Sequence, residues 1–275
     1  GSYILYDYDD LNRLKDEWKK DSQGTTVYRK QYQYDKVGNR TSMTYNYGPT
    51  LSYSYQYNGL GQLSVITEST PGGTYTYSYA YDANGNQVQK IKSYYGTPLI
   101  QWDYSWDVQD RLIKVVKDDL VTSNDRRVEY VYCSSCGGAL TERIEYNATT
   151  GGTILSWLRY EYEGLNLLRI DEKWDNEAPS GIDANDPWRP LNLYSHAPGA
   201  IGQIIKANWF KYHSVNNTEC DTGEYYYFYD AVGNVIGVLE DEGDRFYRFE
   251  IDAFGNDLPG GNSFLAMNQP GPKEH

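Results

Sequence analysis

Two cysteines in a short turn have the clearest chemical potential in this sequence. Cys133 and Cys136 form a Cys-x-x-Cys-Gly turn, which can direct two thiolates at one metal ion. A structural zinc site needs four ligands, and Cys220 with His196 or His213 would have to complete it. Nothing in the spacing requires that arrangement. A short-loop disulfide and a pair of reduced thiols at a turn tip therefore stay open beside zinc.

Carboxylates are the other candidates for chemistry. The polar stretch Asp183–Asp186 could offer oxygen ligands to calcium, but the full spacing of a calcium loop is missing, so a solvated loop is the alternative. Acidic pairs such as Asp9-Asp10 recur, and a glycoside hydrolase would need two carboxylates across a cleft. No serine–histidine–aspartate pattern and no glycine-rich phosphate loop accompany them. We therefore expect no catalysis and no cofactor, with zinc and calcium as the metals to test.

The composition indicates which elements position these residues. The chain of 275 residues contains 30 tyrosines, 26 glycines and 2 methionines, which suits many short strands joined by tight turns. The formal net charge of -13 disfavours a nucleic-acid partner, because an acidic surface repels phosphate backbones. No apolar run approaches the roughly 18 residues of a membrane-spanning helix, so we expect no membrane span.

A motif of the form aromatic-x-aromatic-Asp-x-x-Gly recurs along the chain. Residues two apart on a strand share a face, so both aromatic side chains of a copy point the same way. The Asp can bond backbone groups ahead of it, and the Gly supplies the positive φ of a tight turn. Each copy therefore predicts the tip of a β-hairpin. The motif residues of the clear copies are Tyr6, Tyr8, Asp9, Tyr32, Tyr34, Asp35, Gly38, Tyr55, Tyr57, Gly61, Tyr79, Tyr81, Asp82, Gly85, Tyr104, Trp106, Asp107, Tyr227, Tyr229, Asp230, Gly233, Asp252 and Gly255.

The spacing of the copies predicts the fold class. Two weaker copies open at Tyr130 and Tyr160, and a second polar or glycine-containing reversal lies between successive copies. One period is thus two strands and two turns, and stacked periods place the tyrosines in a ladder with strands about 4.8 Å apart. We expect an all-β spiral array of antiparallel β-hairpins, a solenoid that is curved or partly closed. A β-sandwich explains the alternation of residues but not the fixed return of one motif.

The repeated motif resembles the YD repeat of the RHS family over nearly the whole chain. Residues 225–239, followed by Asp252 to Gly255, are similar to the RHS repeat-associated core domain. The resemblance implies a spiral of β-hairpins that closes into a hollow shell, which encloses a C-terminal effector in bacterial toxins and is displayed at a cell surface in other members. The self-cleaving segment of the core does not appear before His275, so we do not assign self-cleavage.

The predicted organisation is a hairpin array over residues 1–150 and a core-like region over 151–275 that continues it. Residues 171–224 break the period, and one degenerate repeat with a long loop would fill them. That loop caps an end of the array or binds a partner.

We expect a non-catalytic shell or scaffold segment of a larger secreted or surface bacterial protein. Its partners would be the remainder of the same polypeptide or its effector. The alternative is a carbohydrate- or receptor-binding module that binds surface glycans through exposed tyrosines and through Trp102 and Trp106.

Overall fold

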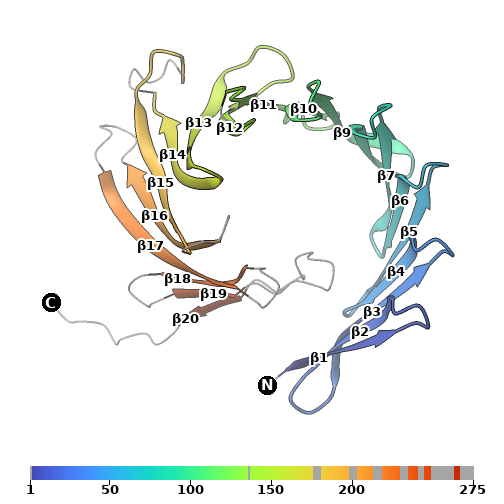
Figure 1. Ribbon diagram of the computed structural model, residues 1–275. Coiled ribbons are helices and arrows are strands. Elements are labelled where there is room, and N and C mark those ends of the chain that lie inside the picture. The colour runs from blue at the N-terminus through green and yellow to red at the C-terminus, as the bar shows by residue number, and fades with distance from the viewer. Residues whose placement is uncertain are drawn as a thin grey trace. The chain divides into compact units, whose positions relative to one another are not determined.

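The computed structural model describes residues 2–135, 137–175, 181–197, 203–212, 219–229, 235–240, 245–248 and 263–266. Every regular element in these residues is a β-strand, which confirms the all-β class (Figure 1). The chain forms two compact units: one comprises Gly1–Glu129 with Tyr146–Gly152, and the other comprises Tyr130–Glu145 with Thr153–His275. Among the described residues there is no helix long and apolar enough to cross a membrane.

The strands are short and follow one another closely along the chain. The first unit contains β1 (Tyr3–Tyr8), β2 (Leu14–Lys20), β3 (Thr26–Tyr34), β4 (Arg40–Asn46), β5 (Thr50–Tyr57), β6 (Leu63–Thr70), β7 (Gly73–Tyr81), β8 (Gln87–Tyr94), β9 (Thr97–Trp106) and β10 (Leu112–Asp119). Strand β11 (Arg126–Tyr132) begins in the first unit and ends in the second. All of β12 (Leu140–Tyr146) except Tyr146 belongs to the second unit. The second unit continues with β13 (Ile154–Glu163), β14 (Asn166–Lys173), β15 (Trp188–His196), β16 (Ile204–Tyr212), β17 (Glu219–Tyr229), β18 (Val235–Glu240), β19 (Arg245–Arg248) and β20 (Ser263–Ala266).

Successive strands pair antiparallel from β1 to β11 and from β13 to β20. Within the described residues, strands contact strands that adjoin them in the chain, and no second sheet packs against them. The array of antiparallel hairpins is therefore confirmed, and the sandwich alternative is wrong. Curvature and closure of the array stay predictions.

The register gives the first unit two chemically different faces. Lys30 pairs with Tyr45, and Tyr53 pairs with Glu68. Directly opposed residues on neighbouring strands share a side, so these side chains lie on one face. We call it the tyrosine face, and its residues are Glu17, Tyr28, Lys30, Tyr32, Met43, Tyr45, Tyr53, Tyr55, Ile66, Glu68, Tyr75, Tyr77, Tyr79, Lys90, Lys92, Trp102 and Tyr104. On β4 to β7 the opposite face carries mainly hydroxyl groups: Ser42, Thr44, Ser52, Ser54, Thr67, Ser69, Thr74, Thr76 and Ser78.

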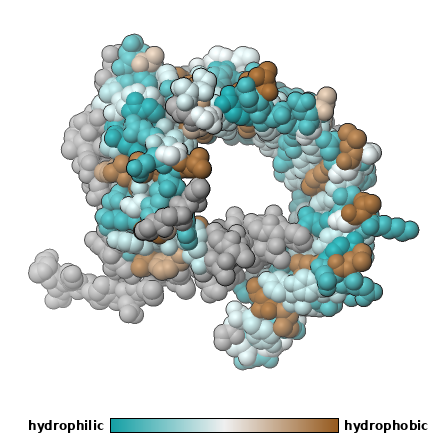
Figure 2. Space-filling view, viewed as in Figure 1, coloured by the Kyte–Doolittle hydropathy of each residue, from teal (hydrophilic) through white to brown (hydrophobic). Residues whose placement is uncertain are grey.

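The small core of the first unit lies on the tyrosine face. Tyr28, Tyr32 and Tyr45 are buried there, together with the charged residues Glu17 and Lys30. The Tyr28 hydroxyl donates to Glu17 Oε1 at 2.8 Å, and Lys30 Nζ lies 5.3 Å from the Tyr45 ring centroid. Cation–π contacts of this kind contribute roughly 0.5–1 kcal/mol at exposed sites and more when desolvated. Where Figure 2 shows this unit, the apolar side chains form separate patches among hydrophilic ones. Backbone ladders and paired rings, not a thick apolar layer, hold the strands together.

Candidate functional site at the seam between hairpins

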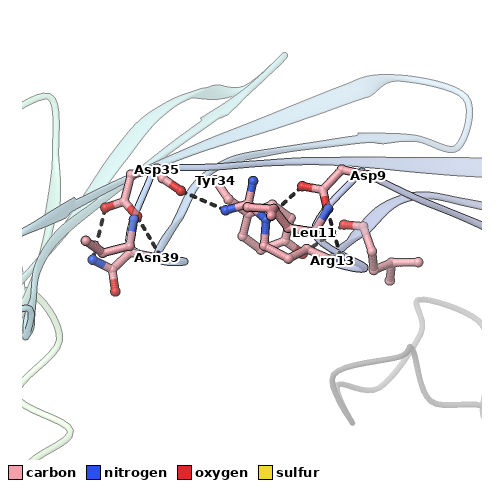
Figure 3. A network of polar contacts seen from close by, with 8 residues as sticks. Asp9, Leu11, Arg13, Tyr34, Asp35 and Asn39 are labelled. Carbon is pink, nitrogen blue, oxygen red and sulfur yellow. Dashed lines mark hydrogen bonds and ion pairs between the residues drawn. The ribbon is translucent and has the colours of Figure 1, made fainter.

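A single side chain closes each hairpin tip. Asp9 Oδ1 accepts the N–H groups of Leu11 and Arg13, both at 2.9 Å (Figure 3). Asn12 takes the left-handed conformation with φ 58°, which Asn tolerates better than most residues. The same two backbone bonds recur at Asp35, Asn58, Asp82 and Asp107, and a residue with positive φ follows each of them three positions later. The structure thus places the motif Asp residues as turn builders.

These hydrogen bonds keep the turn carboxyl groups ionised. The backbone N–H of Arg13 has the largest effect on Asp9 and holds its pKa below the usual value, although partial desolvation opposes it. At Asp35, Asp82 and Asp107 desolvation is the largest single effect and raises the pKa, but the combined hydrogen bonds of each turn outweigh it and lower the pKa. A carboxylate stabilised in this way is a weak proton donor or acceptor near neutral pH.

The second aromatic residue of the motif joins each hairpin to the one before it. The hydroxyl groups of Tyr34, Tyr57 and Tyr81 donate at 2.8 Å to the carbonyl oxygens of Leu14, Arg40 and Leu63, respectively. Each acceptor is the first residue of the return strand of the preceding hairpin. Trp106 does the same with its indole N–H, at 2.9 Å from the Gln87 oxygen. We call this hydrogen bond the latch.

A bulge positions the latch residue. The register of each hairpin shifts at its second aromatic residue, for example between Gln33 and Tyr34 and between Ala80 and Tyr81. The extra residue of each bulge lies on the return strand, at Thr41 and Val88 in these two hairpins, opposite the second aromatic residue. A bulge bends the strand that carries it and increases the local twist of the pair. The latch side chain can therefore reach a carbonyl on the neighbouring hairpin.

Arginine side chains strengthen the same seam. Arg13 Nε lies 2.7 Å from Asp9 Oδ2 in its own turn, and Arg13 Nη1 donates at 2.7 Å to the Asp35 carbonyl of the next turn (Figure 3). Its guanidinium also lies 4.9 Å from the Tyr34 ring centroid. Arg40, the first residue of β4, lies 4.5 Å from the ring centroid of Tyr55, the first aromatic residue of the next copy. Turn, latch and arginine together form one polar seam between adjacent hairpins.

The second unit repeats the seam with one unexpected residue. The Tyr229 hydroxyl donates to the Ile204 carbonyl at 2.7 Å. In the hairpin before it, His196 Nε2 lies 2.6 Å from the Leu167 carbonyl and must donate, because a carbonyl only accepts. The sequence motif missed His196, although it stands midway between Tyr162 and Tyr229 and follows the aromatic Tyr194 by two positions. That spacing was the signal that could have found it.

The remaining motif residues are placed as follows. Tyr6 and Tyr8 lie on β1, and Tyr104 lies on the tyrosine face of β9. Tyr227 lies on β17, where burial raises its pKa. The predicted residues that lie outside the described part of the chain are Cys136, His213, Asp230, Gly233, Asp252 and Gly255.

One cysteine of the turn is in a disulfide bond. Cys133 is disulfide-bonded, so in this state its sulfur offers no thiolate to zinc. Among the described residues no group of three or more His, Cys, Asp or Glu side chains could hold a metal ion. The bonded state of Cys133 agrees with the disulfide alternative for this residue.

The two tryptophans proposed for glycan stacking already have protein partners. Trp106 uses its indole N–H in the latch to Gln87. Lys90 Nζ lies 5.0 Å from the ring centroid of Trp102. Neither side chain is more than partly exposed. The geometry therefore does not present Trp102 and Trp106 as a free aromatic platform.

The stretch that breaks the period contains a hairpin and a pinned loop. Strands β15 and β16 lie within residues 171–224, and residues 181–187 lead into β15; we call residues 181–187 the pinned loop. Lys173, the last residue of β14, is buried and donates at 2.7 Å to the Ala184 carbonyl and at 2.9 Å to the Asp186 carbonyl. The Lys173 ammonium thus binds two main-chain carbonyl oxygens of Asp183–Asp186, the stretch in which the sequence predicted possible calcium ligands.

Aromatic rings enclose the same lysine. Lys173 Nζ lies 4.8 Å from the Trp157 ring centroid and 5.1 Å from that of Trp188. The two rings meet edge to face at 6.0 Å. A cation held between two rings and two carbonyls fixes the loop against its own unit. Both interpretations of this stretch, a cap and a binding loop, stay predictions.

The chain is similar in sequence to parts of several known proteins. No protein-family model matches the chain. The chain is 25% identical over 252 residues to the tRNA3(Ser)-specific nuclease WapA of Bacillus spizizenii, a match covering 90% of this chain and 8% of that protein. It is 24% identical over 233 residues to Teneurin-4 of Mus musculus, covering 80% of this chain and 7% of that protein. The chain thus spans less than a tenth of these relatives, and the matches together with the repeated hairpins support a YD-repeat-like fold.

Solved structures also resemble the chain, and one of them is given as an example. The crystal structure of TcdB2-TccC3-Cdc42 aligns with a TM-score of 0.47 at 14% identity, over 92% of this chain and 15% of that chain.

Proposed function

We propose that this chain is a structural wall segment of a larger secreted or surface protein of the RHS, or YD-repeat, type. The observation that carries the proposal is the latch, which recurs from hairpin to hairpin and ties each one to its predecessor. A seam of this kind makes a stiff ribbon from strands that have almost no common core. A stiff ribbon suits containment.

The acidic side chains of this segment serve structure, so we propose that it does not catalyse a reaction. The turn carboxylates accept backbone N–H groups, and Glu68 accepts the hydroxyl groups of Tyr53 and Tyr77 at 3.1 and 3.0 Å. Nuclease activity is the named property of WapA as a whole, of which the match covers 8%. For this segment, the net charge of -13 argues against holding a tRNA backbone.

The finer proposal is that the full protein encloses an effector behind this wall. Limited proteolysis of the natural full-length protein tests it, with cut sites mapped by mass spectrometry. A wall predicts that the segment after the array resists protease in the native protein. The double change Tyr57→Phe and Tyr81→Phe weakens two latches and should speed cleavage of that segment. If the segment is cut as fast in the native protein as when it is expressed alone, containment is wrong.

A further inference from the structure

Two lysines of β8, on the tyrosine face, have aromatic neighbours but no oxygen partner. Lys90 Nζ lies 5.4 Å from the Tyr77 ring centroid and 5.0 Å from that of Trp102. Lys92 Nζ lies 4.8 Å from the Tyr75 ring centroid and 5.8 Å from that of Tyr77. Neither ammonium group forms a hydrogen bond or an ion pair with a residue that the structure describes. Both lysines are partly exposed, so solvent reaches their N–H donors.

Three other lysines that contact rings show what accompanies such a cation elsewhere in this chain. Lys206 Nζ lies 5.8 Å from a tyrosine ring centroid and 2.5 Å from Glu224 Oε1. Lys173 donates to two main-chain carbonyls of the pinned loop. Lys30 stands directly opposite Glu17 in the sheet register, and both residues are buried. A ring attracts an ammonium group but is a poor acceptor for its three donors, so an oxygen completes each of these sites and is missing from β8.

The charges around the two lysines set a direction. Lys90 and Lys92 are two residues apart on one face of β8, so their stems are about 7 Å apart along the strand. Two strands away on either side, the same face carries the acidic residues Glu68 on β6 and Asp119 on β10. The cation on β10, Lys117, already pairs with Asp119 at 3.6 Å. The unpaired positive charge on this face of β7 to β10 therefore runs along β8 and not across the strands.

We propose that this face of β8 binds an extended acidic peptide whose carboxylates lie two residues apart. An extended strand places alternate side chains on one side at the same repeat of about 7 Å, so successive Asp or Glu side chains each meet one ammonium group. The neighbouring rings already contact lysine and offer little free face for stacking a sugar, whereas a peptide carboxylate needs only the ammonium donors. The site goes beyond the proposed wall function and does not depend on containment.

Two synthetic peptides of equal length and composition test the site. One repeats Glu-Thr, which puts a carboxylate at every second position, and the other repeats Glu-Glu-Thr-Thr, which puts same-side carboxylates twice as far apart. NMR titration of the isotope-labelled full chain measures both affinities. In about 0.1 M salt the Debye length of about 10 Å screens the general repulsion from the net charge of -13. The Glu-Thr peptide should bind roughly two- to fivefold more tightly, the contribution of one further exposed ion pair.

Lys90→Gln and Lys92→Gln should each weaken binding of the Glu-Thr peptide by roughly two- to fivefold, whereas Lys90→Arg should keep it. Lys114→Gln is the matched control, because Lys114 is a partly exposed lysine on the opposite face of β10. Equal affinities for the two peptides, or an equal loss in Lys114→Gln, would overturn the site. Tighter binding of an oligogalacturonate than of the Glu-Thr peptide would overturn it in favour of an acidic glycan. The peptide comparison uses the unchanged chain, so it decides the question even if a glutamine variant does not fold.

Discussion

At the scale of single residues, Tyr81 and Tyr79 allow a comparison between a hydroxyl group that forms a latch and one that does not. The two lie on the same face of β7, and the Tyr81 hydroxyl donates to Leu63 while the Tyr79 hydroxyl donates to no described residue. Tyr81→Phe should lower the free energy of unfolding by about 0.5–1.5 kcal/mol, because one hydrogen bond is lost and its carbonyl is left unpaired. Urea denaturation measures the change. Tyr79→Phe is the control, and equal losses in the two variants would contradict the latch.

The turn carboxylates make a second prediction, on acid stability. The pKa of Asp82 is lowered in the folded chain: desolvation raises it, but the hydrogen bonds from Asn86, Asn84 and Gly85 outweigh that effect. A lowered pKa means stability that is present above the unfolded value of about 3.9 and is lost as pH falls through the folded value. Asn58 makes the same backbone bonds without a charge. Asp82→Asn should therefore fold at neutral pH and lose less melting temperature than the wild type on acidification.

Thermal melts of the two chains across the acid range check this prediction. Asp10→Asn is a control at an exposed carboxylate in another turn. A steeper acid dependence in the Asp82→Asn variant than in the wild type would contradict the assigned role of Asp82.

At the scale of elements, the structure within one hairpin could be predicted from the sequence alone. The Asp-to-Gly turn and the shared face of two aromatic residues are local consequences of backbone geometry, so Asp35, Gly38 and Tyr34 could be assigned without coordinates. The latch needed the register between hairpins. Whether Tyr34 reaches Leu14 depends on a bulge and on a strand 20 residues away. His196 was missed because it occupies the position of the second aromatic residue, but histidine is not one of the residue types of the motif.

The pinned loop shows the same limit and gives an element-scale prediction. The sequence placed a polar loop in the right range but gave no sign that Lys173 binds the Ala184 and Asp186 carbonyls. Lys173→Met removes the cation and both bonds, so hydrogen exchange at residues 181–187 should quicken by tenfold or so, while exchange in β3–β8 stays unchanged. Lys114→Met, at a partly exposed lysine of the first unit, is the control. Unchanged exchange at 181–187 would show that the loop is held by other contacts.

At the scale of the whole molecule, the tyrosines stabilise the sheets, and their ionisation at high pH should destabilise them. Burial, followed by the Glu68 hydrogen bond, raises the pKa of Tyr77 to about 12, and burial raises the pKa of Tyr194 in the second unit to about 12. A raised pKa means stability that is fully present below the unfolded value of about 10 and is lost as pH rises through the folded value. Both units should therefore hold their sheets to about pH 10 and lose them between about pH 10 and 12.

Tyrosinate absorbance and far-ultraviolet circular dichroism, followed together, test this window. The two signals should change together, because ionising Tyr77 beside Glu68 places two negative charges on neighbouring strands within a thin layer. Glu68→Gln removes one of those charges, so the tyrosines it contacts should ionise at lower pH while the β signal survives to a higher degree of ionisation. Complete tyrosine ionisation near pH 10 with the sheet intact would contradict this prediction. It would show that un-ionised tyrosine rings do not hold the strands together, so other interactions would have to stabilise a wall of latched hairpins.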